Sequence, residues 1–269
     1  MVVYYPSADG GATVDPAAVP CPVIIFAPGL TLSPRFYLSY AEQLASWGYI
    51  VHLAHYKGVN NLNSVADVKT HLDLFLDQND APTGLFSGTM DKDRIGVAGH
   101  SMGAKYSVMV CMEDDRFKTA VTMEAVDGAA GVMSPKPFAP AISPERMNEV
   151  DEPILYMGGE FTSFFAPTGE NFQAFFAQSE SPAQMVRILD ADHASFHDYQ
   201  LGVWVEMLHL LMGGHKTNDL QTRNIATQYM VAWFKVYLEG DESFRTYLTG
   251  DVAQADVAAG LLEISTKGL

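Results

Sequence analysis

Short runs of consecutive apolar residues alternate along this chain with longer segments whose apolar residues recur every three or four positions. An unbroken apolar run is typical of a strand covered on both faces, whereas the wider spacing is typical of a helix with one buried face. Such runs, and segments that are mostly apolar, predict strands at Val23–Ala27, Tyr49–Ala54, Ile95–Ala98, Thr119–Met123, Ile154–Met157 and Gln184–Leu189. Val2–Tyr5 is predicted to be an edge strand. The periodic segments predict helices at Phe36–Ser46, from Ser64 onward, and at Met102–Cys111, Asn171–Gln178 and Ile225–Leu238, followed by a polar tail.

Strands that alternate with helices at this spacing predict an α/β fold: a mostly parallel central sheet with helices on both faces. We expect one domain over residues 1–269, because no repeat or low-complexity linker divides the chain. Two stretches break the alternation, Asp127–Val150 and Leu201–Arg223. They could border a substrate cleft or simply be surface loops, and the sequence favours neither.

The segment Gly99-His100-Ser101-Met102-Gly103 lies between a predicted strand and a predicted helix, and it fits the pattern G-x-S-x-G. A serine at the tip of a sharp strand-to-helix turn has strained backbone angles, so the flanking positions must carry almost no side chain. Gly99 and Gly103 meet that demand, and the following helix directs its partly positive amino end at the serine. The pattern predicts Ser101 as a catalytic nucleophile, the alternative being a turn without chemistry.

A serine nucleophile needs a histidine base, which on such a fold lies in the loop after the last strand, in the chain order Ser…acid…His. His193 stands just past Gln184–Leu189 and is the predicted base, with His197 as its competitor. The two histidines could instead form an i, i+4 metal pair, but no third ligand is suggested. We therefore expect neither a metal nor an organic cofactor. His100, inside the elbow, is expected to flank the cleft without taking a proton.

The oxyanion hole of such a site requires two backbone N–H groups. One is predicted to be that of Met102, the residue after the nucleophile. The second is predicted to be that of Leu30, because Pro28-Gly29 forms a turn directly after the strand Val23–Ala27.

Three carboxylates compete for the role of the acid that orients the histidine. Glu124 comes at the carboxyl end of the strand Thr119–Met123, Asp127 lies in the turn beyond it, and Glu160 follows the next strand. We favour Glu124, then Glu160, then Asp127; at least two of the three must be ordinary loop carboxylates.

The composition narrows the classes of partner. The chain has 269 residues, with 16 Lys and Arg against 32 Asp and Glu, a formal charge of −16. A surface so acidic repels nucleic acid and anionic lipid headgroups. Cys21 and Cys111 predict buried free thiols, no apolar run is long enough to span a membrane, and no signal peptide is recognisable at the start, which leaves the compartment open.

With these residues laid out, the chain resembles α/β-hydrolases of the chlorophyllase and bacterial polyester-hydrolase (cutinase-like) group. Phe26–Thr31 and Gly99–Gly103 are shared by the group, and Phe165–Asn171 is similar to a chlorophyllase segment of the Ala-Pro-Thr-Gly-x-Asn type. Tyr229–Lys235, with Phe244–Tyr247 beyond it, resembles the closing helix of polyester hydrolases.

The resemblance also bears on the acid. In chlorophyllases the catalytic aspartate lies in a Leu-Asp-Pro-Val segment, on which Met123-Glu124-Ala125-Val126 falls with Glu in place of Asp. In polyester hydrolases the acid comes one strand later, where this chain has Glu160 and no aspartate. Met102 and Ala104 also depart from chlorophyllases, which commonly carry Arg and Gly at these positions.

These observations predict a serine carboxylic-ester hydrolase of the α/β-hydrolase fold that acts through an acyl-enzyme on an apolar ester. The resemblance implies a chlorophyllase-like reaction, chlorophyll to chlorophyllide and phytol. The alternatives are a polyester, cutin or lipid esterase, a hydrolase-fold acyltransferase or perhydrolase, and a non-catalytic binding protein with a hydrolase fold.

Overall fold

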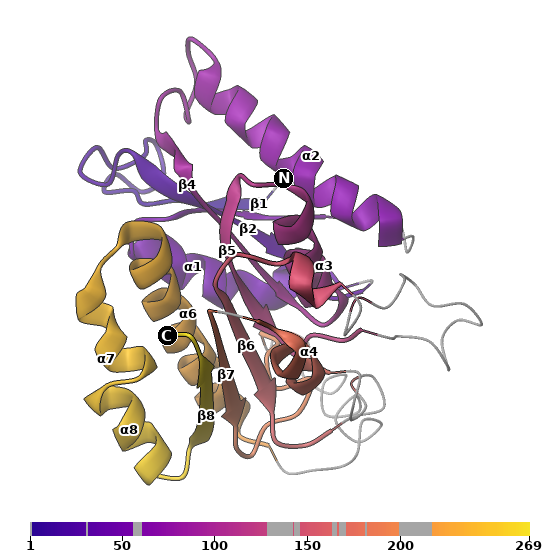
Figure 1. Ribbon diagram of the computed structural model, residues 1–269. Helices are drawn as coiled ribbons and strands as arrows, with labels where there is room; N and C mark the ends of the chain where they lie inside the picture. The colour runs from indigo at the N-terminus through magenta and orange to yellow at the C-terminus, as the bar shows by residue number, and fades with distance from the viewer. Residues whose placement is uncertain are drawn as a thin grey trace.

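The computed structural model describes residues 2–30, 32–55, 61–127, 142, 146–162, 166, 171–180, 182–198 and 217–269, with the backbone alone for residues 61–64. Within these ranges an eight-stranded sheet has the order β1-β3-β2-β4-β5-β6-β7-β8 (Figure 1). The strands are β1 (Val2–Tyr4), β2 (Cys21–Ala27), β3 (Ile50–Leu53), β4 (Met90–His100), β5 (Phe117–Met123), β6 (Ile154–Gly159), β7 (Ala183–Ile188) and β8 (Leu262–Lys267).

The sheet is parallel from β3 to β7 and antiparallel only at its two edges, where β1 pairs with β3 and β8 pairs with β7. The predicted mostly parallel sheet is therefore confirmed. The expectation that the strand ending near Leu189 is the last one was wrong, because Leu262–Lys267 in the supposed polar tail forms β8. Leu262 is the one buried residue of β8, and the other five are half-buried or exposed, which suits an edge strand that is covered on one face only.

The helices of the described residues are α1 (Leu38–Ser46), α2 (Asn61–Asp80), α3 (Met102–Glu113), α4 (Phe172–Gln178), α6 (Asp219–Glu239), α7 (Arg245–Leu248) and α8 (Asp251–Ala258). Three short 3₁₀ turns accompany them: η1 (Pro34–Tyr37), η2 (Met147–Glu149) and η3 (Glu242–Phe244). The closing helix α6 begins six residues before its predicted start, where the Asn218 side chain caps it by accepting the N–H of Gln221.

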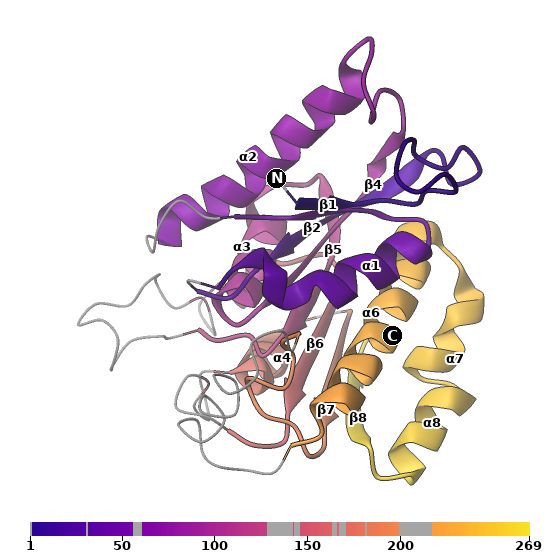
Figure 2. The ribbon, with the colours of Figure 1, turned by 180° about the vertical axis from the view of Figure 1, so that it is seen from behind.

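Helices cover both faces of the sheet (Figures 1 and 2). On one face, α2, α3 and α4 bury side chains such as Leu72, Val108 and Phe175. On the other face, α1 and α6 bury side chains such as Leu44 and Trp233. The two apolar clusters fix the sheet from both sides and leave the strand ends as the place where loops can carry polar chemistry.

The carboxyl ends of β2, β4, β5, β6 and β7 meet at one edge of the sheet, because these strands run parallel. Leu30, Ser101, Glu124 and His193 all follow shortly after such strand ends. The topology thus brings together residues that are up to 163 positions apart in the sequence.

Candidate active site

Ser101 lies between β4 and α3 with φ 58° and ψ −123°, a conformation that is strained for a residue with a side chain. The flanking glycines make this turn possible. A Cβ on Gly99 would come within 2.4 Å of the Gly103 carbonyl oxygen, and a Cβ on Gly103 within 2.1 Å of the Ala27 carbonyl oxygen. The Ser101 N–H donates to the Met123 carbonyl at 2.9 Å, which fixes the tip of the turn to the end of β5.

Ser101, His193 and Glu124 form one continuous chain of polar contacts. His193 Nε2 lies 3.0 Å from Ser101 Oγ, and His193 Nδ1 lies 3.1 Å from Glu124 Oε2. Glu124 and His193 are only 2% and 4% exposed, so water screens their interaction little. A base that faces the serine on one side and a carboxylate on the other is the arrangement that activates a hydroxyl nucleophile.

Glu124 reaches His193 across the end of β6, since β6 separates β5 from β7 in the sheet. Its backbone has φ 49°, and its N–H donates to the Met157 carbonyl at 2.8 Å. The second carboxylate oxygen accepts the N–H of Gly159. A Cβ on Gly159 would lie 2.5 Å from the Ala191 carbonyl oxygen, so glycine at this position lets the loop with His193 approach Glu124.

The other two candidate acids have different partners. Glu160 accepts the Asp190 N–H at 3.1 Å and lies 4.0 Å from the Arg187 guanidinium, near the surface. Asp127 is buried, and its Oδ1 lies 3.0 Å from Lys105 Nζ. The contact with the His193 ring is made by the carboxylate that the sequence ranks first, Glu124.

The loop that carries His193 is held by its own short-range hydrogen bonds. Asp192 Oδ1 accepts the N–H groups of Ala194 at 2.8 Å and of Ser195 at 3.2 Å. The Asp192 N–H in turn donates to Ser195 Oγ at 3.0 Å. This turn around His193 fixes its backbone, which leaves the ring little freedom to leave Ser101.

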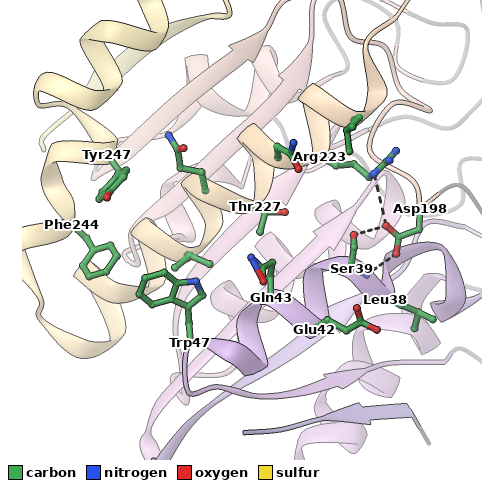
Figure 3. Close-up of a pocket in the computed structure, with 14 residues that line it drawn as sticks. Leu38, Ser39, Glu42, Gln43, Trp47, Asp198, Arg223, Thr227, Phe244 and Tyr247 are labelled. Atoms are coloured by element: carbon green, nitrogen blue, oxygen red, sulfur yellow. Dashed lines mark hydrogen bonds and ion pairs between the residues drawn. The ribbon is translucent and has the colours of Figure 1, made fainter.

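The far end of the same loop is fixed to α1 and α6. The Asp198 carboxylate accepts the Ser39 N–H at 2.7 Å and also the Ser39 hydroxyl, so it caps the amino end of α1 from a distant part of the chain. From α6, Arg223 donates to the His197 carbonyl at 3.0 Å. Figure 3 shows Ser39, on α1, and Arg223, on α6, both directed at Asp198.

The predicted oxyanion donors lie on two adjoining pieces of backbone. Met102 is the first residue of α3, so its N–H has no acceptor within the helix. The missing side chain of Gly103 lets the first turn of α3 pack against the backbone of Ala27 and Pro28, shortly before Leu30. Among the described residues, no backbone acceptor takes the Leu30 N–H. The role of both N–H groups in an oxyanion hole stays a prediction.

The alternative of a metal pair at His193 and His197 finds no support in the ring contacts. Both ring nitrogens of His193 face Ser101 and Glu124, whereas His197 packs edge-on against Phe36 and Tyr37. Within the ranges that the structure covers, no cluster of three or more His, Cys, Asp or Glu is arranged to hold a metal ion.

A groove of about 690 Å³ runs between α1 and α6 (Figure 3). Arg223 and Asp198 lie at one end of it, and Trp47, Phe244 and Tyr247 lie at the other. The triad residues predicted from the sequence do not line this groove. The stretches predicted to border a substrate cleft fall largely on residues 128–141, 143–145 and 199–216, which lie outside the described residues.

Two contributions to the site were not anticipated from the sequence. Gly159 gives its N–H to Glu124 and leaves space for the His193 loop, and the only sequence signal is the pair Gly158-Gly159 at the end of a strand. Tyr37 packs on Phe26 and contacts His100 at 2.9 Å; a buried tyrosine in a predicted helix carries no such signal.

Two comparisons with known proteins bear on the family of this chain. No curated protein matches the sequence significantly. The sequence model of the chlorophyllase family matches residues 14–261, which is most of the chain and includes Ser101, Glu124 and His193. In addition, no helix among the described residues is long and apolar enough to cross a membrane. On the strength of the family match and the sheet that accompanies it, this chain belongs to the chlorophyllase family, a group of ester hydrolases of the α/β-hydrolase type.

Proposed function

We propose that this protein is a serine carboxylic-ester hydrolase that works through an acyl-enzyme on an apolar ester. The observation that carries the proposal is the unbroken contact chain from Ser101 Oγ through His193 to the buried Glu124. The family match supports the same reaction class.

In the first half-reaction, Ser101 Oγ attacks the ester carbonyl while His193 Nε2 takes its proton. The N–H groups of Leu30 and Met102 stabilise the oxyanion that develops, together with the partly positive amino end of α3. His193 then gives the proton to the leaving alcohol, which leaves Ser101 acylated. Glu124 holds the ring with its proton on Nδ1 and stabilises the imidazolium that forms.

In the second half-reaction, a water molecule takes the place of the departed alcohol. His193 removes a proton from this water, which attacks the acyl group, and the released proton returns to Ser101. No metal ion or organic cofactor takes part in the proposed reaction.

The proposed substrate is a chlorophyll-type ester, hydrolysed to chlorophyllide and phytol. The family supports this choice, and so does the placement of Glu124 after the strand that follows the elbow helix, where chlorophyllases have their acid. Polyesters, cutin and long-chain lipid esters are the alternative substrates, because they too present an apolar chain next to an ester bond.

The test is turnover of p-nitrophenyl esters of increasing chain length and of chlorophyll a by the wild type, Ser101→Ala, Glu124→Gln and Glu160→Gln. We expect Ser101→Ala to be inactive and Glu124→Gln to lose about 10³–10⁴-fold in kcat, because an amide no longer enforces the productive tautomer. Glu160→Gln is the matched control and should stay within about threefold of the wild type, since Glu160 binds the Asp190 backbone and Arg187.

Nearly normal activity of Glu124→Gln would refute its assignment as the acid. A wild type without turnover on any ester would favour a binding protein with a hydrolase fold. Ester exchange with added alcohol or peroxide exceeding hydrolysis would favour an acyltransferase or perhydrolase.

A further inference from the structure

A buried hydrogen-bond chain connects three loops of the site and uses two residues that have no role in the reaction described above. The Gly29 N–H donates to the Tyr37 hydroxyl at 3.2 Å, and this hydroxyl lies 2.9 Å from His100 Nδ1. On the other side of the ring, His100 Nε2 lies 3.0 Å from the His193 carbonyl oxygen. Tyr37 and His100 are both fully buried.

The chemistry of these groups fixes the direction of each hydrogen bond. A carbonyl oxygen only accepts, so His100 Nε2 carries the proton that it donates to His193. Burial, with smaller contributions from His197 and His193, holds the pKa of His100 well below its usual range, so the ring is neutral and its Nδ1 accepts. His197 Nε2 also lies near this nitrogen, at 3.4 Å, but the Tyr37 hydroxyl is closer at 2.9 Å. The Tyr37 hydroxyl therefore donates to Nδ1 while it accepts the Gly29 N–H. Burial also raises the pKa of Tyr37 above its ordinary value, which keeps its proton in place.

This series of hydrogen bonds is connected to proposed catalytic groups at three points. Gly29 precedes Leu30, the predicted oxyanion donor, and His100 precedes Ser101, the predicted nucleophile. The third attachment is to the backbone of His193 itself, the predicted base. One tyrosine and one neutral histidine thus join the ends of β2 and β4 and the loop after β7.

We propose that Tyr37 and His100 are positioning residues that set the distances between the Leu30 N–H, Ser101 Oγ and the His193 ring. This inference rests on the proposed serine-hydrolase function and adds to it a device that neither the G-x-S-x-G pattern nor the triad contains. A displacement of a reacting group by about 1 Å can cost about 100-fold in rate, so even a small shift of these loops is measurable.

The first variant of the test is Tyr37→Phe, which removes the hydroxyl and keeps the ring that packs on Phe26 at a centroid distance of 4.9 Å. Tyr156→Phe is its matched control, because Tyr156 is also fully buried and its hydroxyl accepts one hydrogen bond, from Ser179 at 2.8 Å. Each variant loses a buried tyrosine hydroxyl, but only Tyr37→Phe breaks the chain between the three loops.

The second pair is His100→Gln and His100→Met, which have side chains of similar length. Glutamine can present an N–H near the place of His100 Nε2 and so keep the hydrogen bond to the His193 carbonyl, whereas methionine cannot. Rescue by glutamine relative to methionine therefore isolates that single hydrogen bond from the packing of the ring.

Turnover of a p-nitrophenyl ester is measured per active site titrated with a fluorophosphonate, together with KM and the rate at which the fluorophosphonate reacts with Ser101. We expect Tyr37→Phe to lower kcat and the labelling rate by about tenfold or more with KM within about twofold, and Tyr156→Phe to leave all three near wild type. His100→Met should be slower than His100→Gln.

A Tyr37→Phe enzyme whose kcat and labelling rate per titrated site equal those of the wild type would overturn the positioning role, even if its melting temperature falls. This variant decides the question if the His100 variants do not fold. A wild type that neither hydrolyses esters nor reacts with the probe at Ser101 would overturn the proposed function, and the positioning role with it. Probe reaction that is lost in Ser101→Ala supports the proposed function, and the rates of Tyr37→Phe then decide the positioning role separately.

Discussion

Replacing Lys105 by methionine removes one partner of a buried ion pair beneath the site. Lys105 is fully buried in α3, and its Nζ lies 3.0 Å from Asp127 Oδ1 and 2.6 Å from the Asp127 carbonyl oxygen. Asp127 is 4% exposed, and its Oδ1 also accepts the Ile142 N–H at 2.8 Å. Lys105→Met would therefore remove a positive charge from within 3.0 Å of a carboxylate in a place that water barely reaches.

The expected cost of Lys105→Met is about 3–5 kcal/mol of unfolding free energy, the range for breaking a buried pair from one side. The Lys105–Asp127 pair itself contributes little to the unfolding free energy. Burial lowers the pKa of Lys105 below its ordinary value, although Asp127 acts in the opposite direction, so desolvation outweighs the attraction. The double variant Lys105→Met/Asp127→Asn keeps an acceptor for Ile142 and removes both charges. It should recover to within about 2 kcal/mol of the wild type.

The assay is urea unfolding at pH 7 of the wild type, both single variants and the double variant, combined as a double-mutant cycle. Lys69→Met is the control, since Lys69 pairs with Glu113 at 2.8 Å on the surface, where the side chains are 30% and 33% exposed. The Lys69–Glu113 pair should contribute less than about 1 kcal/mol to the unfolding free energy. A loss below about 1 kcal/mol for Lys105→Met, or a coupling energy near zero, would refute the reasoning.

Two further outcomes follow from other parts of the molecule. His52 is fully buried, neither of its ring nitrogens has a hydrogen-bond partner among the described residues, and burial, then the charge of His71, lowers its pKa to about 3. As the pH falls below about 6.5, the His52 ring therefore becomes protonated in the unfolded chain while it stays neutral in the folded protein. Between about pH 7 and pH 5 the unfolding free energy of the wild type, measured with urea, should fall by about 2 kcal/mol more than that of His52→Leu. Equal losses in the two proteins would contradict the assignment. Gly103→Ala places a Cβ 2.1 Å from the Ala27 carbonyl oxygen, so it should lower the melting temperature by several degrees and abolish ester turnover; a variant with normal values for both would disprove the close contact.

Much of the fold could be predicted because the parallel strands are buried on both faces and leave unbroken apolar runs. Strand β2, for example, is buried at every position, and its predicted core Val23–Ala27 lies within the observed strand. Strand β8 was missed because an edge strand has only one buried face, and only Leu262 of its six residues is fully shielded from solvent.

In the candidate site, too, some features could be predicted from the sequence and others could not. The elbow is predictable because its geometry excludes side chains at Gly99 and Gly103, and that exclusion is visible in the sequence. The acid could only be ranked, since several carboxylates follow neighbouring strands and their partners depend on tertiary contacts. The role of Tyr37 was not predicted for a related reason. Its contact with His100 spans 63 positions, and nothing in the neighbouring sequence distinguishes it from a core tyrosine.

The left-handed backbone at Ser101 and Glu124 has a consequence for how this enzyme can be altered. Together with Asp190, these are the residues other than glycine that have positive φ in the described part of the chain. Each such conformation costs about 1–3 kcal/mol, which glycine would largely avoid. At position 124 this gain is offset, because glycine would remove the carboxylate that the buried Gly159 N–H and the His193 ring contact. A library selected for heat resistance alone is therefore expected to enrich glycine at position 101, so directed evolution of this scaffold has to select for turnover in every round.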